Sequence, residues 1–183
     1  MMERKIKWKG LKYPSQEDCI LKETDNGVEV TSVITGTVEN KTFKLKYRVL
    51  ANKLWETSLL DLHVILNGNE RTLLLEKKEG CWLVNNVVDH RLDACVDIDI
   101  SLSPFTNTLP IRRLVYNGHV RNKIEVVYID IIANIIMPVT QYYTKISDSV
   151  YLYENEKTTF SAELKTDSHG LVIAYPNLFI EQW

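Results

Sequence analysis

The sequence predicts a mainly β protein, and two observations support that fold class. Valine, isoleucine and threonine number 17, 16 and 14 of the 183 residues, whereas alanine numbers 5. Branching at Cβ restricts χ1 in a helix and packs well on a pleated sheet. Stretches that alternate apolar and polar residues also recur along the chain, which is typical of strands with one buried face. With only 7 glycines and 5 prolines, no linker divides the chain, and we expect one domain over residues 1–183.

The alternating stretches predict the strands one by one. The first two cover residues 27–33 and 43–49. Residues 61–66 and 71–75 flank an Asn67-Gly68 pair, which supplies the positive φ angles of a tight hairpin turn. The remaining predicted strands are 81–84, 95–102, 123–129, 135–144, 150–153, 159–164 and 171–175.

One segment departs from the strand pattern. Residues 103–110 are turn-like, and residues 111–115 are predicted to form a short helix. Thr108 is expected as its N-cap, and Pro110 would lie in the first turn, where a missing N–H costs nothing. The apolar residues of the helix share one face because they lie at i, i+3 and i+4: Ile111, Leu114 and Val115.

Charge and hydropathy exclude two classes of protein. A formal net charge of −2 argues against nucleic-acid binding, because such domains usually carry a clear basic excess. No apolar h-region follows the charged start, so no secretory signal is visible. The most apolar stretch, residues 126–139, contains Asp130 and Asn134 and is shorter than the roughly 20 residues of a spanning helix. We therefore expect no membrane-spanning segment.

Signals of metal, cofactor or nucleophilic chemistry are also lacking. Three cysteines without a C-x-x-C pair, and four scattered histidines, support neither a zinc site nor a disulfide framework. No G-x-S-x-G, P-loop or G-x-G-x-x-G motif is present. We expect no catalytic residue, no cofactor and no metal. Buried, reduced thiols in a cytoplasmic protein are expected instead: Cys19, Cys81 and Cys95.

Residues 106–114, Thr-Asn-Thr-Leu-Pro-Ile-Arg-Arg-Leu, resemble the hallmark run of the putative glycolipid-binding family of bacteria. One departure is Asn52, where the family favours Asp shortly before Trp55, so a role that needs a carboxylate there loses support. The resemblance covers nearly the whole chain through Tyr47, Trp55, Leu92, Cys95, Asp97, Asp99, Ser103, Pro104, Tyr128, Gln141, Tyr143, Asp167, Gly170, Leu171, Val172, Tyr175, Pro176, Leu178 and Phe179.

The resemblance implies a spiral β-roll, a long, curved, mostly antiparallel sheet wrapped around one short α-helix. It also implies a homodimer and, through the family's likeness to bacterial lipoprotein carriers, a glycolipid or similar amphiphile as the ligand. On this basis the leading interpretation is a non-catalytic protein that binds such a ligand inside the roll. The alternatives are an enzyme acting on a sugar or lipid-linked substrate, and a structural homodimer without a small ligand.

Two carboxylates and two arginines are the central candidate residues. Asp97 and Asp99 project from the same strand face. If the sheet wraps the helix, Arg112 and Arg113 become partly enclosed, and enclosed charge must be paired or solvated. We therefore expect these carboxylates to meet the arginines across the interior. The open alternatives are glycosidase-like catalysis by the carboxylates and capture of an anionic head group by the arginines.

Other candidates each have a structural alternative. Thr106 and Asn107 could bond sugar hydroxyls or only form the helix entry. Gln141 and Tyr143 are candidate ligand-binding residues because they are among the residues that carry the family resemblance. The aromatic residues could form a stacking platform or plain core: Trp8, Trp55, Trp82, Tyr128, Tyr142 and Tyr143. The predicted ligand-binding set is Asp97, Asp99, Thr106, Asn107, Arg112, Arg113, Gln141 and Tyr143.

Overall fold

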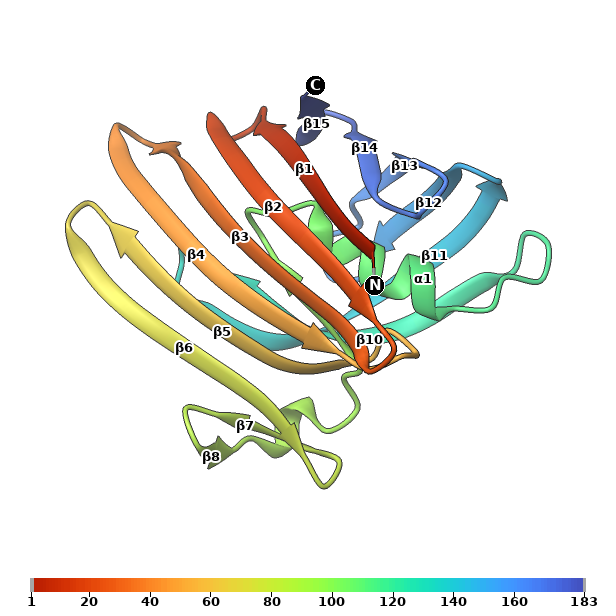
Figure 1. Ribbon diagram of the computed structural model, residues 1–183, viewed down its shortest axis with the longest axis horizontal. Helices are drawn as coiled ribbons and strands as arrows, with labels where there is room; N and C mark the ends of the chain where they lie inside the picture. The colour runs from red at the N-terminus through yellow and green to blue at the C-terminus, as the bar shows by residue number, and fades with distance from the viewer. Residues whose placement is uncertain (1, 183) are drawn as a thin grey trace.

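The computed structural model describes residues 2–182, in which all strands join one 15-stranded sheet (Figure 1). Three short helical segments accompany the sheet: η1 (His90–Leu92), η2 (Phe105–Asn107) and α1 (Thr108–Arg113). The strands are β1 (Met2–Gly10), β2 (Ser15–Thr24), β3 (Gly27–Val38), β4 (Lys41–Ala51), β5 (Thr57–Leu66), β6 (Asn69–Lys78), β7 (Cys81–Val84), β8 (Val87–Val88), β9 (Asp97–Ile100), β10 (Arg121–Asp130), β11 (Ile135–Ser147), β12 (Val150–Asn155), β13 (Ser161–Thr166), β14 (Val172–Tyr175) and β15 (Phe179–Gln182).

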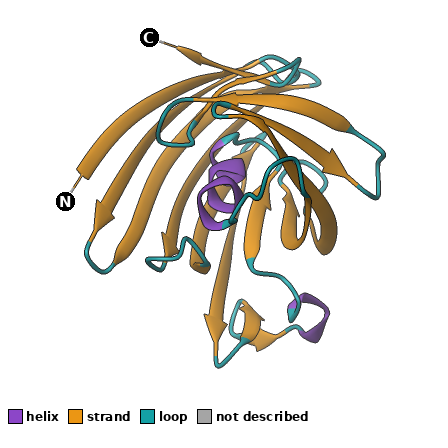
Figure 2. Ribbon diagram, turned by 90° about the vertical axis from the view of Figure 1, so that its right-hand side faces the viewer, coloured by secondary structure: helices purple, strands orange, loops and turns teal. Residues whose placement is uncertain are grey.

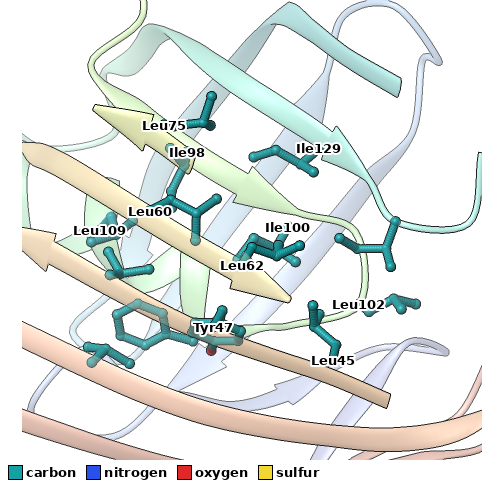
Figure 3. Packing of buried hydrophobic residues seen from close by; sticks show 14 of the residues in the cluster. Leu45, Tyr47, Leu60, Leu62, Leu75, Ile98, Ile100, Leu102, Leu109 and Ile129 are labelled. Carbon is teal, nitrogen blue, oxygen red and sulfur yellow. The ribbon is translucent and has the colours of Figure 1, made fainter. Parts of the chain in front are cut away.

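The order of the strands explains the shape of the molecule. The sheet runs from β8 at one edge back along the chain to β1, crosses to β15, and continues to β9 at the other edge. Neighbours pair antiparallel except β9 and β10, which pair parallel. Strand twist makes so long a sheet curl. The curl lays Ile98 and Ile100 of β9 against Leu60 and Leu62 of β5 (Figure 3). The predicted spiral β-roll is confirmed.

The inner strands have two buried faces, which define two parts of the interior. On one face, Ile98, Ile100, Val127 and Ile129 join the larger core cluster beneath the outer strands. On the other face, Val126 of β10 packs with Tyr143, Tyr153 and Leu164 of the β11–β13 region. Asp97 and Asp99 alternate with Ile98 and Ile100 and therefore belong to this second face.

The helix lies inside the curled sheet, as predicted (Figure 2). Leu109 and Ile111 are 0% and 5% exposed and contact the two core clusters, respectively. Burying two large aliphatic side chains stabilises the fold by about 1.5–3 kcal/mol each. The helix is therefore part of the core of the roll.

The limits of the helix differ from the prediction. It begins at Thr108 and ends at Arg113, and Leu114 already has extended backbone angles (φ −73°, ψ 143°). Val115 is consequently outside the helix and 77% exposed. Thr108 is not the N-cap, because η2 leads directly into α1 and the Thr108 amide bonds to carbonyls of η2. Because η2 carbonyls already accept the hydrogen bond of this amide, no side-chain cap is needed at Thr108.

Most predicted strands are confirmed, and the differences have local causes. Leu66, Asn67, Gly68 and Asn69 form the expected tight hairpin turn, with φ of 48° and 82° at Asn67 and Gly68. The strand predicted over residues 95–102 shortens to β9, and residues 131–134 form a turn that divides the apolar run before β11. Four strands were not predicted: β1, β2, β8 and β15. Charged residues occur on both faces of β1 and β2 and disturb the alternation, whereas β8 and β15 have only two and four residues.

The structure also bears on the expectations for membrane-spanning segments and for the cysteines. Within residues 2–182, no helix has the length and apolar character needed to cross a membrane. The three cysteines are unpaired, and the expected burial is confirmed for Cys19 and Cys95. The expectation is wrong for the burial of Cys81, which is half-buried because it begins the short hairpin strand β7 near the edge of the sheet.

Candidate functional site

A cavity of about 340 Å³ lies at one end of the roll, between the inner strands and the turns that join the outer ones. Side chains from β2, β9, β10, β11, β12, β14, β15 and η2 meet there with side chains from four turns: β1–β2, β10–β11, β12–β13 and β14–β15. The turn that follows β9 also contributes. The lining residues are Lys12, Tyr13, Ser15, Asp99, Ile100, Ser101, Leu102, Ser103, Asn107, Tyr128, Asp130, Ile132, Met137, Val139, Tyr153, Asn155, Lys157, Thr158, Phe160, Tyr175, Leu178 and Phe179.

Aromatic rings form one wall of this cavity. The Tyr153 ring centroid is 6.0 Å from that of Tyr175 and 6.3 Å from that of Phe160, and Tyr175 is 6.1 Å from Phe179. Tilted and edge-on pairs at such distances attract one another and hold the rings in place. Tyr13 and Tyr128 add two further aromatic side chains to the lining. The wall therefore offers ring faces and edges to a ligand.

The polar end of the cavity is centred on Asp99. Its Oδ2 accepts a hydrogen bond of 2.6 Å from Gln141 Nε2, and its Oδ1 accepts one of 3.2 Å from Thr106 Oγ1. Burial raises the pKa of Asp99, and these two hydrogen bonds oppose part of the rise. Asn107 also lines the cavity, and its Oδ1 accepts a 2.8 Å hydrogen bond from the Tyr143 hydroxyl. The surrounding strands therefore hold both polar side chains in fixed positions.

Asp97 has a different partner. Arg113 Nε and Nη2 donate to Oδ1 and Oδ2 of Asp97 at 3.1 and 2.5 Å, a bidentate pair. The Asp97 side chain is fully buried and that of Arg113 is 17% exposed. Burial raises the pKa of Asp97, and the Arg113 guanidinium opposes it. The predicted meeting of carboxylate and arginine is confirmed for this pair.

The expectation is wrong for Asp99 and Arg112, which do not pair. Arg112 Nη1 donates to the His169 carbonyl at 2.9 Å, and Nη2 lies 3.4 Å from Glu23 Oε2. Its guanidinium stacks 4.5 Å from the Trp55 ring centroid. Arg112 and Arg113 are successive residues of α1, so they point in different directions around the helix axis. Only Arg113 faces β9.

Glu17 of β2 is a buried acid that the sequence prediction missed. Its Oε1 accepts hydrogen bonds from the hydroxyls of Tyr47 (2.6 Å), Ser32 (2.7 Å) and Ser103 (2.9 Å). Its Oε2 has no partner among the described residues. Burial raises the pKa of Glu17 to about 7, against the effect of the three hydroxyls. Ser103 also lines the cavity, so it connects this acid to the site.

The structure also gathers one group of metal-type donors in residues 2–182. Cys81, His90 and Asp93 each place a donor atom within 4.8 Å of the others, near η1 and far along the sheet from the cavity. His90 and Asp93 are exposed and already bond each other at 3.0 Å. Scattered positions in the sequence gave no sign of this grouping.

Of the eight predicted ligand residues, five lie in one connected region. Asp99, Thr106 and Gln141 form one hydrogen-bonded group, and Asn107 and Tyr143 form another beside it. Asp99 and Asn107 are the two that line the cavity. The other three are Asp97, Arg113 and Arg112, which take part in ion pairs outside the lining.

Most of the aromatic wall was not among the predicted site residues. Among the aromatics considered, Trp8, Trp82 and Tyr143 are core, whereas Tyr128 lines the cavity. Trp55 is buried beneath Arg112, and Tyr142 lies outside the lining beside Arg121. The missed wall residues come from strands and turns late in the chain: Tyr153, Phe160, Tyr175 and Phe179. Alternation places Tyr153 on an inward face, but only the curl of the sheet brings that face to β9.

Comparison with known proteins gives two matches. The sequence model of a family described as "Putative glycolipid-binding" matches residues 5–180. The chain is also similar to a DUF1089 family protein from Pseudomonas aeruginosa whose crystal structure is known. The two sequences are 36% identical, the match covers 91% of each chain, and the TM-score is 0.82. No curated protein matches the chain.

Proposed function

The chain belongs to the putative glycolipid-binding family, and from this premise we propose that it is a non-catalytic protein that binds the polar head of a glycolipid or similar amphiphile. The cavity beside β9 is the binding site in this proposal. The observation that carries it is the combination of an aromatic wall with two fixed polar groups, Asp99 and Asn107.

The chemistry of the lining supports a sugar-like head group. A sugar ring has apolar C–H faces that pack on aromatic rings, and hydroxyls that bond to carboxylate and amide groups. A site with mostly apolar walls and a few placed polar groups is the usual design of small-molecule pockets. Here Tyr153 and Tyr175 supply ring surfaces, while Asp99 and Asn107 supply hydrogen-bonding groups.

The size of the cavity determines which part of an amphiphile it can hold. About 340 Å³ is close to the lower end of the roughly 300–1,000 Å³ typical of ligand pockets. It suits a head group of one or two rings, whereas acyl chains need other surface. Phe160, which is 39% exposed, belongs to the lining, and Leu11, which is 46% exposed, directly precedes the lining residue Lys12. Each CH₂ that an acyl chain buries on such surface contributes about 0.8 kcal/mol.

Blocking the mouth of the cavity tests the proposal. Thr158 is exposed and lines the mouth, so Thr158→Trp should fill the entrance. Thr42 on β4 is also exposed but is absent from the lining, so Thr42→Trp is the matched control. Native mass spectrometry of protein purified from its own host should show a bound saccharide-bearing lipid with wild type and Thr42→Trp, and none with Thr158→Trp. Equal amounts of lipid on both variants would place the ligand elsewhere and overturn the proposal.

Two further expectations stay predictions. Assembly as a homodimer is tested by size-exclusion chromatography with light scattering, and a cytoplasmic location by fractionation of the host cells.

A further inference from the structure

The two carboxylates of β9 differ in whether a cation pairs with them, and this difference concerns the ligand. Asp97 is buried permanently with a cation, since Arg113 bonds both of its oxygens. Asp99 lies two residues further along the same face and is bonded only by neutral donors, Gln141 and Thr106. A carboxylate removed from water is costly unless it is paired. The fold thus supplies a counter-ion to one carboxylate and leaves the other without one.

No other cation of the described chain neutralises Asp99. Within residues 2–182, no lysine, arginine or histidine nitrogen lies within 4.0 Å of its oxygens. The two lysines of the lining, Lys12 and Lys157, are exposed at the mouth. Lys12 Nζ lies over the Tyr13 ring and Lys157 Nζ is 3.2 Å from Met137 Sδ, and neither forms an ion pair with the carboxylate. Asp99 keeps some accessible surface because it faces the cavity.

The surroundings of Asp99 favour a positive charge. Tyr128 is the register partner of Asp99 in the β9–β10 pair, and Tyr153 lines the same cavity. Tyr153 in turn contacts Tyr175 and Phe160 through its ring. Aromatic faces attract cations, and the attraction grows when water is excluded. A carboxylate beside several aromatic rings is therefore suited to hold an ammonium group.

We propose that the head group bound in this cavity carries a protonated amine, as in an amino-sugar lipid, and that Asp99 is its counter-ion. The inference rests on the proposed function and names its ligand class. The amine donates hydrogen bonds to Asp99 in the place that Arg113 occupies at Asp97, while the sugar ring packs against Tyr153 and Tyr175. A neutral glycolipid of the same shape leaves the carboxylate unpaired.

A matched pair of ligands tests the proposal on the full-length protein. Octyl β-glucoside and octyl 2-amino-2-deoxy-β-glucoside differ only in a hydroxyl or an ammonium group. Isothermal titration calorimetry below the micelle concentration, at pH 7, should show about tenfold to hundredfold tighter binding of the amino compound. This is the value of a hydrogen bond to a charged group, about 1.5–3 kcal/mol. In Asp99→Asn the preference should fall to about one. Asp18→Asn, which changes an exposed carboxylate of β2 outside the lining, should retain it.

Each outcome has a defined meaning. Equal affinities of wild type for the two glycosides overturn the inference and leave the proposed function standing. Binding of neither glycoside overturns the proposed function, and the inference with it. The wild-type comparison decides without any variant, so poor folding of Asp99→Asn does not affect the result. A preference that persists in folded Asp99→Asn would assign the amine to another group and also overturn the role of Asp99.

Discussion

At the scale of single residues, burial decides the behaviour of the acidic side chains. Asp97 and Glu17 are buried and Asp99 is partly buried, and burial raises the pKa of each. They differ in their partners: an arginine for Asp97, neutral donors for Asp99, and three hydroxyls for Glu17. These partners determine how a mutation or a change in pH alters the free energy of unfolding.

Removal of Arg113 should be strongly destabilising. Arg113→Met leaves Asp97 buried without its cation, and the expected loss is about 3–5 kcal/mol in the free energy of unfolding. Arg48→Met is the control. It should cost clearly less, because Arg48 and its partner Glu29 keep 48% and 39% of their side-chain surface exposed and such pairs contribute little. Urea denaturation measures both losses. Similar losses for the two variants would contradict this account of the buried pair.

Glu17 should make stability fall as pH rises. In the folded protein it keeps its proton up to about pH 7, whereas its ordinary pKa is 4.5. Between these values the folded state binds more protons than the unfolded state, so the free energy of unfolding decreases with pH. The full effect is about 3 kcal/mol, since one pKa unit corresponds to about 1.4 kcal/mol.

The comparison with Glu17→Gln isolates this contribution, because Asp97 and Asp99 change stability in the same direction in both proteins. Urea denaturation from pH 4.5 to 8 should show a smaller decrease for the variant than for wild type. Parallel curves for the two proteins would contradict a protonated Glu17.

At the scale of elements, the loop between β13 and β14 is fitted to α1. Asp167 accepts hydrogen bonds from the amides of His169 and Leu171 and so shapes a tight loop. Gly170 in this loop has φ of 77°, and a Cβ there would lie 3.1 Å from Arg112 Cδ and 3.2 Å from Ile111 Cγ2. The loop therefore needs a residue without a side chain at this contact with the helix.

Two glycine substitutions separate backbone strain from this contact. Gly68 has a similar φ of 82°, but nothing lies within 4 Å of the place that a Cβ would take there. Gly68→Ala should cost about 1 kcal/mol through φ alone. Gly170→Ala should cost about 1–3 kcal/mol more, because the methyl group overpacks the helix side chains. Thermal or urea denaturation measures the difference. Equal costs would mean that the loop moves freely against α1.

At the scale of the whole molecule, the curl gives the two edges of the sheet different environments. β8 and β9 are both short edge strands. Val87 and Val88 of β8 are 68% and 45% exposed, whereas Ile98 and Ile100 of β9 are each 1% exposed. The side of β9 that pairs with no strand is also covered, since Thr106 Oγ1 accepts a 3.3 Å hydrogen bond from the Ile100 amide. Covering an edge in this way prevents it from pairing with another chain.

Amide hydrogen exchange should reveal this difference. The amides of Val96, Ile100 and Ser101, which bond to Glu125, Thr106 and Ile129, should exchange only with global unfolding. Those of Val87 and Val88 should exchange through local fraying. Similar protection of β8 and β9 would contradict the account in which the curled sheet encloses and stabilises β9.

Local rules explain how much of the fold could be predicted. Alternation identified β3 and β4, and Asn67-Gly68 identified the turn between β5 and β6. β1 and β2 were missed because Arg4, Glu17 and Glu23 disturb the alternation on the inward faces. Those faces also carry the core residues Ile6, Trp8, Cys19 and Leu21. The spiral shape came from the resemblance of residues 106–114, since neither alternation nor composition specifies how far a sheet curls.

The candidate site was predictable only in part, for a related reason. Asn107 could be chosen because it lies in the recognised run, and Asp99 because it closely precedes that run. Tyr153, Phe160 and Tyr175 lie about 50 or more residues further on. Their approach to β9 depends on the order of the strands in the sheet. The same holds for the arginines: both were expected to pair with β9, and only Arg113 does.

The sequence by itself determined that this chain forms strands and that one short helix interrupts them, because both follow from residue type and spacing along the chain. The expected enclosure of acidic and basic side chains near that helix came from the family resemblance. Only the tertiary structure decided which carboxylate received a cation and which faces the aromatic cavity. That choice depends on the direction of each side chain around α1 and on the curl of a 15-stranded sheet, both of which are set by packing across the interior.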